Sequence, residues 1–326
     1  MTVGHQALRD HDLKKAEACY SAALRQATPY GEQDPRYAES LHALALIYEL
    51  EDRFDASKRL YSAELRILQR LDVDYSSQGM ALNELAKMER GVGHLDAALH
   101  YYSQAVIAYG KEPVKFGWEI AMCQGGAGDC YKNKHEYAKA ETMLEQAISF
   151  WQKSTVVGHE AYMGVCLITL GEVHSLEGRY TDAESTYKRD LRNLENLGPC
   201  PDKLVATAAC MEGMAQNYRL AAKYDVAIAT FKQAFSGWEN AERPPEEARC
   251  LMELGETYKL CGKYSDAALS FKKAISLLET IDRQYHNESA NLILCKQMLA
   301  TLDKANSNER TNTIHVQTNH GPGTEQ

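Results

Sequence analysis

The sequence predicts an all-α protein built from pairs of helices that stack one after another. The first observation is a repeat, in which a small residue recurs every 40 to 44 positions. The seven small residues are Ala16, Ser57, Ala98, Ala140, Ala183, Ala227 and Ala267. The second observation is that apolar residues within each repeat are spaced three and four apart, which is typical of amphipathic helices. A fixed period of this length indicates a stacked-repeat architecture.

The last full repeat, residues 247–278, shows why each repeat should contain two helices. Leu251, Leu254 and Tyr258 form one apolar series, and a second series starts after Gly262. Glycine adopts the left-handed backbone that ends many helices, so Gly262 fits a turn between two helices. The equivalent positions in the other repeats are His11, Asp52, Gly93, His135, Gly178 and Ala222.

Proline positions agree with this division. Proline inside a helix costs about 3 kcal/mol, but it is favourable at a helix start. None of the eight prolines falls inside an expected helix. Those between repeats are Pro29, Pro35, Pro113, Pro199, Pro201, Pro244 and Pro245, and Pro322 lies in the tail.

The elements follow in chain order. We expect a solenoid over residues 1–284, a capping helix over 285–305, which closes the exposed face of the last repeat, and a disordered tail over 306–326. The expected helix pairs span residues 1–28, 37–71, 78–109, 116–153, 161–196, 203–240 and 246–282.

The repeat resembles the tetratricopeptide repeat. The segments LGETY…GKYxxA…FxxA at 254–274 and LGEVH…GRYxxA…Y at 170–187 carry its signature. The longer period is similar to that of kinesin light chains, whose repeats carry a groove-facing asparagine before the Leu-Ala pair. Only Asn83 keeps it here, and the replacements are His42, Gly125, Ile168, Glu212 and Met252. Because no heptad segment precedes the repeats, the resemblance is to the repeat class and not to a kinesin light chain. It implies a right-handed α-solenoid of seven helix pairs whose first helices line a concave groove.

Composition excludes several classes of protein. The net charge of −9 argues against nucleic acid, whose phosphates require a basic surface. No run of about 18 apolar residues is present, so a membrane span is not expected. The start of the chain has no apolar segment typical of a signal peptide. Nine cysteines at scattered positions form no disulfide framework and indicate a cytoplasmic protein.

We find no sequence pattern that predicts an enzyme, a metal site or a cofactor. The eleven histidines form neither an HExxH nor an HxH pair. Gly125, Gly126 and Gly128 fall inside an expected helix, where small residues permit close packing. His174 replaces a tyrosine of a first helix and is expected to be half-buried. The repeats leave no residues for a catalytic domain, so we expect a protein that is not an enzyme.

The resemblance implies which side chains face a ligand. The candidate peptide-binding residues are Asn83, Lys87, Arg90, Met122, Asp129, Lys132, Asn133, Glu172, Gln216 and Arg219. We expect Lys87, Arg90 and Lys132 to form a basic spot that takes an acidic partner. The alternative is that these residues are solvated ends of helices. No three consecutive repeats carry the lysine and asparagine pattern of the chaperone-tail-binding members.

The resulting functional expectation is a non-enzymatic interaction scaffold that captures a peptide segment of a partner protein in its groove. The alternative is a regulatory subunit that senses a ligand or peptide and changes a partner's activity. Residues 1–28 lack a preceding helix cap and leave an apolar face open, which predicts self-association or a partner contact there, unless upstream sequence precedes Met1.

Overall fold

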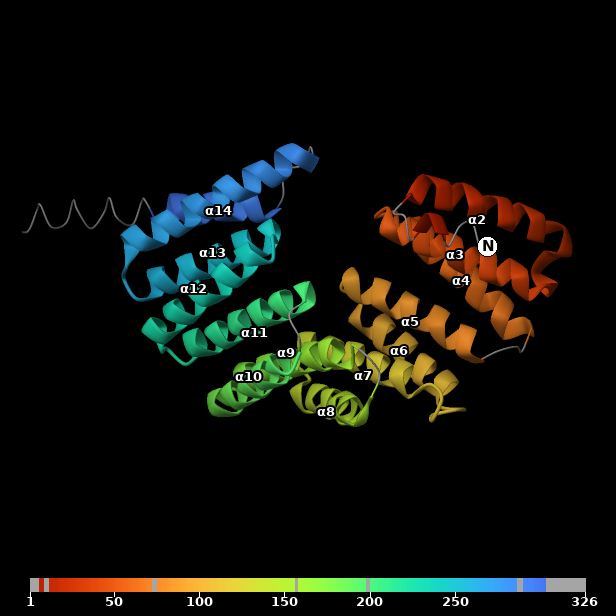
Figure 1. The fold of residues 1–326 in the computed structure, drawn as a ribbon, viewed down its shortest axis with the longest axis horizontal. Coiled ribbons are helices and arrows are strands. Elements are labelled where there is room, and N and C mark those ends of the chain that lie inside the picture. Colours follow the sequence, from red (N-terminus) through yellow and green to blue (C-terminus); the bar gives the residue numbers. More distant parts are fainter. Residues whose placement is uncertain are drawn as a thin grey trace, which may run out of the picture. The chain divides into compact units, whose positions relative to one another are not determined.

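The computed structural model describes residues 6–8, 12–71, 75–155, 158–197, 200–285 and 290–302. Helices account for all the regular elements in these ranges, as Figure 1 shows. The protein is an all-α helical repeat solenoid, as its sequence predicts. In the described part of the chain, no helix combines the length and apolar character needed to cross a bilayer.

Each repeat contributes two antiparallel helices joined by a short turn. Apart from one short 3-10 helix, the elements from α2 to α14 alternate between first and second helices of successive repeats. Their bounds are α2 Leu13–Ala27, η1 (3-10) Thr28–Gln33, α3 Pro35–Leu50, α4 Phe54–Leu71, α5 Tyr75–Gly91, α6 Leu95–Tyr109, α7 Gly117–Asn133, α8 Tyr137–Lys153, α9 His159–Leu176, α10 Tyr180–Glu195, α11 Pro201–Leu220, α12 Tyr224–Asn240, α13 Pro244–Leu260 and α14 Tyr264–Tyr285.

The contacts divide the chain into two units, one up to Thr169 and one from Leu170 onward. In the first unit, α5 packs on α6 and α6 packs on α7, around the buried Tyr61, Leu85 and Tyr102. In the second unit, α11 packs on α12 and α13 on α14, around Phe231 and Phe271. Because each helix contacts mainly its chain neighbours, the core grows along the stack and not around one centre.

Residues 290–302 form a further helix after α14. Its Leu292, Cys295 and Leu302 are buried and belong to the same apolar core as Phe271. The predicted tail over 306–326, and a helix start at Met1, lie outside the described residues. Helix α14 runs to Tyr285, so it ends slightly later than the predicted repeat.

The turns inside the helix pairs use the left-handed backbone at one equivalent position. The glycines there are Gly93, Gly178 and Gly262, with φ of 82°, 76° and 75°. Asp52, His135 and Ala222 occupy the same place with φ of 58°, 60° and 55°. A side chain with a Cβ is strained in this region, so the turn geometry is imposed by the packing of the two helices. His11 lies outside the described residues.

Proline and glycine positions agree with the sequence interpretation. Pro35, Pro201 and Pro244 each begin a helix. Within α7, a Cβ on Gly126 would lie 2.4 Å from the Tyr102 ring, and one on Gly128 would lie 2.6 Å from Leu144. These two glycines therefore permit close helix packing, as predicted.

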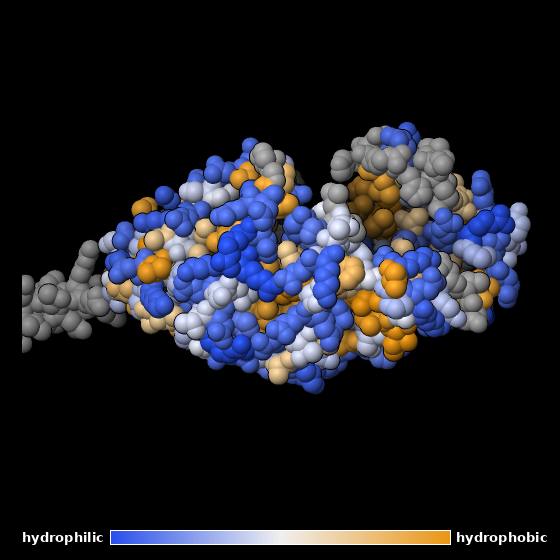
Figure 2. Space-filling view, turned by 60° about the horizontal axis from the view of Figure 1, so that its bottom comes forward, coloured by the Kyte–Doolittle hydropathy of each residue, from blue (hydrophilic) through white to orange (hydrophobic). Residues whose placement is uncertain are grey.

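The surface and the cysteines complete the description. Hydrophilic side chains cover most of the face in Figure 2, with smaller apolar patches between them. All nine cysteines are free thiols. The buried ones are Cys123, Cys130, Cys166, Cys210, Cys250 and Cys295, whereas Cys200 is exposed.

Candidate functional site

A cavity of about 350 Å³ opens between the first helices of the first unit. We call it the α7 cavity, because α7 supplies more of its lining residues than any other helix, with α5 and α9 lining it as well. Its lining residues are Asn83, Lys87, Arg90, Tyr102, Ala121, Met122, Gly125, Gly126, Asp129, Trp151, Tyr162, Val165, Cys166 and Thr169.

The cavity exists because α7 carries small residues where other first helices carry large ones. Gly125 takes the position that holds His42 in α3, Asn83 in α5 and Glu212 in α11. A Cβ on Gly125 would meet only the Cys166 sulfur, at 3.0 Å. The neighbouring Gly126 lets the Tyr102 ring lie directly against the helix.

One wall of the α7 cavity is aromatic. The rings of Trp151 and Tyr162 stack with centroids 5.5 Å apart, and Trp118 packs edge-on against both. The Trp118 indole N–H donates a hydrogen bond to the Met122 sulfur at 3.1 Å, which holds that side chain at the rim. Such a wall suits an apolar or aromatic side chain of a ligand.

One buried polar group that lines the cavity lacks a hydrogen-bond partner of normal geometry in the described part of the chain. The Trp151 indole N–H is buried and has no hydrogen-bond acceptor of normal geometry. The Cys166 thiol is the polar group beside it, and burial raises the pKa of that thiol to about 12, although the indole opposes the shift. Cys166 is therefore a neutral, unreactive part of the wall.

The rim carries alternating charges. Lys87 pairs with Glu84, and its ammonium nitrogen lies 3.7 Å from Glu49. Arg90 and Lys132 each lie 3.0 Å from an oxygen of Asp129. Three cations thus face three carboxylates.

The pairing of these charges differs from the basic spot expected from the sequence. Lys87 and Arg90 lie on α5 and Lys132 lies on α7, and each of the three has a carboxylate partner. Burial disfavours the charge on Lys87, yet Glu84 holds the pKa of Lys87 above its usual value. Arg90 is likewise half-buried, and Tyr102 and Asp129 raise its pKa despite burial. Both cations remain charged in a rim that is electrically balanced, not basic.

The predicted site residues fall into three groups. Asn83, Lys87, Arg90, Met122 and Asp129 all line the α7 cavity. Lys132 reaches its rim through Asp129, and Asn133 is exposed at the end of α7. The remaining three, Glu172, Gln216 and Arg219, belong to the second unit and do not line this cavity.

Sequence reasoning missed the aromatic wall. Trp151 belongs to the second helix α8, and Tyr162 lies ten residues before Glu172, the candidate residue expected in α9. Their convergence depends on contacts between repeats, which single-repeat periodicity does not encode. The one available signal was Gly125, because a glycine at a position otherwise held by larger residues leaves a hollow.

A second cavity, of about 570 Å³, is also lined by Lys87 and Arg90. We call it the α5 cavity, because it lies at the end of α5, against the α3–α4 turn. Its lining residues are Glu49, Phe54, Asp55, Lys58, Lys87, Met88, Arg90, Gly91, Val92 and His94. Beside it, the buried Glu89 accepts from Lys58 at 2.5 Å and lies 2.8 Å from His94.

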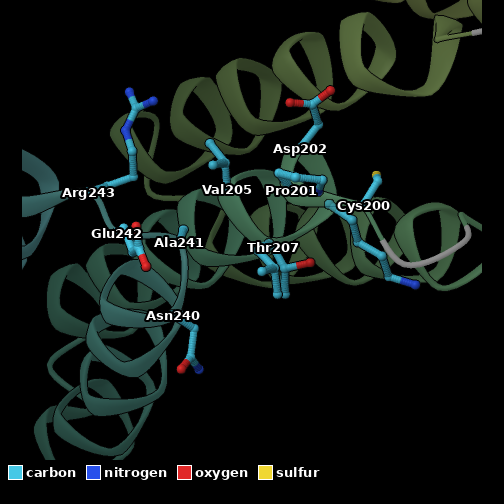
Figure 3. A pocket seen from close by; sticks show the side chains of 12 residues that line it. Cys200, Pro201, Asp202, Val205, Thr207, Asn240, Ala241, Glu242 and Arg243 are labelled. Carbon is cyan, nitrogen blue, oxygen red and sulfur yellow. The ribbon is translucent and has the colours of Figure 1, made fainter.

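The second unit contains a larger hollow of about 960 Å³, between the start of α11 and the end of α12 (Figure 3). Cys200, Asp202, Glu242 and Arg243 are among its lining residues, and all four are exposed. None of the predicted site residues lines it, and its charged side chains are solvated. It is a weaker candidate than the α7 cavity.

In the second unit, the repeat position equivalent to Gly125 is occupied by Glu212 of α11. Glu212 is 2 % exposed and accepts hydrogen bonds from Arg249 at 2.5 and 3.1 Å and from the Trp238 indole at 2.9 Å. Burial raises the pKa of Glu212, and Arg249 opposes that rise. Glu212 is buried and the Arg249 side chain is 49% exposed, and none of the cavities described above is lined by Glu212.

No group of three or more histidine, cysteine, aspartate or glutamate side chains in the described ranges could hold a metal ion. His174 is buried, not half-buried as predicted, and lies 3.4 Å from the Thr186 hydroxyl. It packs in the core of the second unit.

Comparison with known proteins identifies the repeats. Residues 167–198 and 204–280 match family models of the tetratricopeptide repeat. No curated protein sequence matches the chain significantly.

Solved structures share the fold at low identity. The apo form of RapI is 17% identical with a TM-score of 0.70, over 86% of this chain and 96% of that one. A tetratricopeptide repeat protein from Parabacteroides merdae ATCC 43184 is 18% identical, with a TM-score of 0.63 over 92% and 95% of the two chains. A Rap protein complexed with Competence and Sporulation Factor is 17% identical, with a TM-score of 0.58 over 86% and 74%.

Proposed function

Because the chain is a tetratricopeptide repeat protein, we propose that it is a non-enzymatic scaffold that captures a peptide segment of a partner protein. The α7 cavity is the proposed capture site. The observation that carries the proposal is that residues from α5, α7 and α9, the first helices of three successive repeats, line one cavity. An extended peptide lying across first helices could place a side chain there.

The shape and chemistry of the cavity support a side-chain anchor. Its volume of about 350 Å³ is at the low end for a small-molecule site and is sufficient for a large side chain. Aromatic walls and a rim of charged hydrogen-bonding groups are typical of interface anchors, which have an apolar centre and a polar edge. Tyr162 and Val165, exposed by 41% and 65%, would be covered by the bound segment.

A photocrosslinking experiment tests this proposal. A benzophenone amino acid replaces Met122, at the cavity rim, or Ile107, an exposed residue of the second helix α6 that serves as the control. Crosslinked partner segments are sequenced from cell extract and resynthesised, and their affinity is measured by fluorescence anisotropy. We expect a defined segment at position 122 that is absent at position 107.

The same segment is then tested against Gly125→Leu, which fills the cavity from the wall. We expect the affinity to fall by at least tenfold while the melting temperature stays within a few degrees. Equal affinity for the wild type and Gly125→Leu would contradict capture in the α7 cavity. Failure to recover any segment at position 122 would contradict it as well.

A second function is favoured by one observation. Helix α9 contributes Tyr162, Val165 and Cys166 to the cavity and continues beyond Thr169 into the second unit. A ligand in the cavity would contact the helix that joins the units, as a regulatory sensor requires. The solved Rap protein bound to Competence and Sporulation Factor is a complex on the same fold. Hydrogen exchange distinguishes the two functions: a sensor should change protection in residues 170–176 on ligand binding, and a passive scaffold should not.

The cellular setting and self-association are further parts of the proposal. Free cysteines favour the cytoplasm as the location. Ala7, Ala16 and Tyr20 pack against Leu44 and Ile47, so the described part of residues 1–28 is covered on that side. Contact with a second copy or a partner through residues 1–28 stays a prediction, which light scattering on the purified chain would test.

A further inference from the structure

We propose that the captured peptide carries a single carboxylate between two apolar side chains, with the carboxylate on Arg90 and the apolar groups in the α7 and α5 cavities. This inference rests on the proposed peptide capture and specifies its chemistry. It follows from the fact that the two cavities share Lys87 and Arg90.

Lys87 and Arg90 form the divide between the cavities. They are three residues apart on α5, so they lie on one face of the helix, one turn apart. Each side chain lines both cavities. A peptide that fills both must therefore cross these two cations.

Arg90 has unused hydrogen-bonding capacity. Its Nη1 donates to Asp129 at 3.0 Å, and among the described residues neither Nη2 nor Nε donates a hydrogen bond. A guanidinium can hold two carboxylates through different edges, and a half-buried one gains more from a charged partner than a solvated one does. Lys87 is a poorer candidate, because Glu84 and Glu49 already surround its ammonium group.

The charge balance limits the ligand to one carboxylate. Lys87, Arg90 and Lys132 are matched by Glu49, Glu84 and Asp129. One added carboxylate can share Arg90, but it leaves the rim with an excess negative charge. A run of acidic residues would be repelled, so the site does not fit a polyacidic segment.

The two cavities suit apolar side chains of different kinds. The α7 cavity presents the stacked rings of Trp151 and Tyr162. The α5 cavity presents Phe54 and Val92, which are 51% and 62% exposed. Covering exposed apolar side chains provides the affinity, and the carboxylate fixes the position of the peptide between them.

The test uses a library of synthetic octapeptides in a Gly/Ser background. Each peptide holds Phe and Leu, in either order and one to four residues apart, with Asp, Asn or an Asp triplet between them. Affinity for the full chain is measured by fluorescence anisotropy. We expect the single-Asp peptides to bind best, with a roughly ten- to hundredfold loss on changing Asp to Asn. The triplet should bind more weakly than the single Asp.

Arg90→Gln is the decisive variant. It leaves Asp129 paired with Lys132, so no carboxylate is stranded, and a melting curve checks that the fold is kept. We expect it to abolish the preference for Asp over Asn. Arg243→Gln, which breaks an exposed pair with Glu246 in the second unit, is the matched control and should keep the preference.

The outcomes separate this inference from the proposed function. If peptides bind, and Gly125→Leu blocks them, but Asp and Asn bind equally, the carboxylate assignment is wrong and peptide capture stands. An Asp preference that survives Arg90→Gln also overturns the assignment. If no peptide from an unbiased library binds in the α7 cavity, the proposed function itself fails.

Discussion

Gly125 in α7 and Glu212 in α11 occupy the same place in their repeats and produce opposite results. At Gly125 the missing side chain leaves the α7 cavity, with Trp151 beneath it. At Glu212 a buried carboxylate meets Arg249 and the Trp238 indole, and the space is filled. The helices around both positions have similar lengths and similar partners.

The difference teaches that the scaffold and the site are set by different residues. Small residues and aromatics at the helix crossings determine how each pair packs. The position at Gly125 and Glu212 is free to vary, because the packing tolerates either an empty or a satisfied polar space. The proposed capture site therefore depends on one omitted side chain.

We expect the largest effect from removing the charged partner of Glu212. Arg249→Ala leaves Glu212 buried with only the Trp238 indole as a partner. Glu212 is buried but the Arg249 side chain is 49% exposed, so the loss should lie at the low end of the range for breaking a buried ion pair, about 3 kcal/mol in the free energy of unfolding, measured by urea denaturation. Glu212→Met combined with Arg249→Leu should restore most of it, since an apolar pair strands no charge. A double variant as unstable as Arg249→Ala would contradict this account.

The next effect concerns two further carboxyls at equivalent positions of second helices. Glu64 lies 3.1 Å from His42, whereas neither oxygen of Asp190 has a hydrogen-bond partner of normal geometry. The Cys210 thiol lies beside Asp190 but donates to the Tyr187 carbonyl. Burial opposes a charged His42, yet Glu64 holds the pKa of His42 above its usual value, while burial raises the pKa of Asp190 to about 6.

Asp190→Asn should therefore stabilise the protein in a pH-dependent way. The carboxyl is protonated more readily in the folded chain than in the unfolded chain, so wild-type stability falls as pH rises from about 4 to above 6. We expect the variant to gain about 3 kcal/mol above pH 6 and nothing below pH 4. Urea denaturation at pH 4 and pH 7 measures the gain, and an equal gain at both values would refute the assignment.

Two adjacent glycines provide a smaller and sharper contrast. Gly126→Ala places a Cβ 2.4 Å from the buried Tyr102 ring and should cost about 1–3 kcal/mol. In Gly125→Ala the new Cβ meets only the Cys166 sulfur, at 3.0 Å, and alanine favours a helix over glycine by about 1 kcal/mol. Thermal melts should shift in opposite directions. If both variants melt lower, Gly125 is a packing residue and the cavity is incidental.

The smallest effect lies in the turns. Ala222→Gly and His135→Gly relieve a left-handed backbone at φ of 55° and 60°. The relief is partly offset by the greater entropy of glycine in the unfolded chain, leaving a gain of about 0.5 kcal/mol. Gly178→Ala, at the same place in another repeat, should lose a similar amount. Denaturation midpoints test both directions, and equal signs would contradict a common turn geometry.

The sequence allowed prediction of the repeats and their helices, because periodicity, glycine and proline act within a few residues of one another. The resemblance to the repeat class placed Asn83, Lys87 and Arg90 on the groove side of one helix, and all three line the α7 cavity. The aromatic wall was not foreseen, because Trp151 approaches Tyr162 only through packing between repeats. The rim was misjudged as basic for the same reason, since Asp129 reaches Arg90 across 39 positions of sequence.

The distribution of the thiols has a consequence for how the protein reacts with electrophiles. Burial raises the pKa of Cys123 to about 12 and that of Cys130 and Cys295 to about 11, so these sulfurs are almost never thiolates at neutral pH. Cys200 is the exposed thiol among the described residues. A brief maleimide pulse on the folded chain should therefore modify Cys200 first. A dye, spin label or cross-linker could thus be attached at the start of α11 without any mutation.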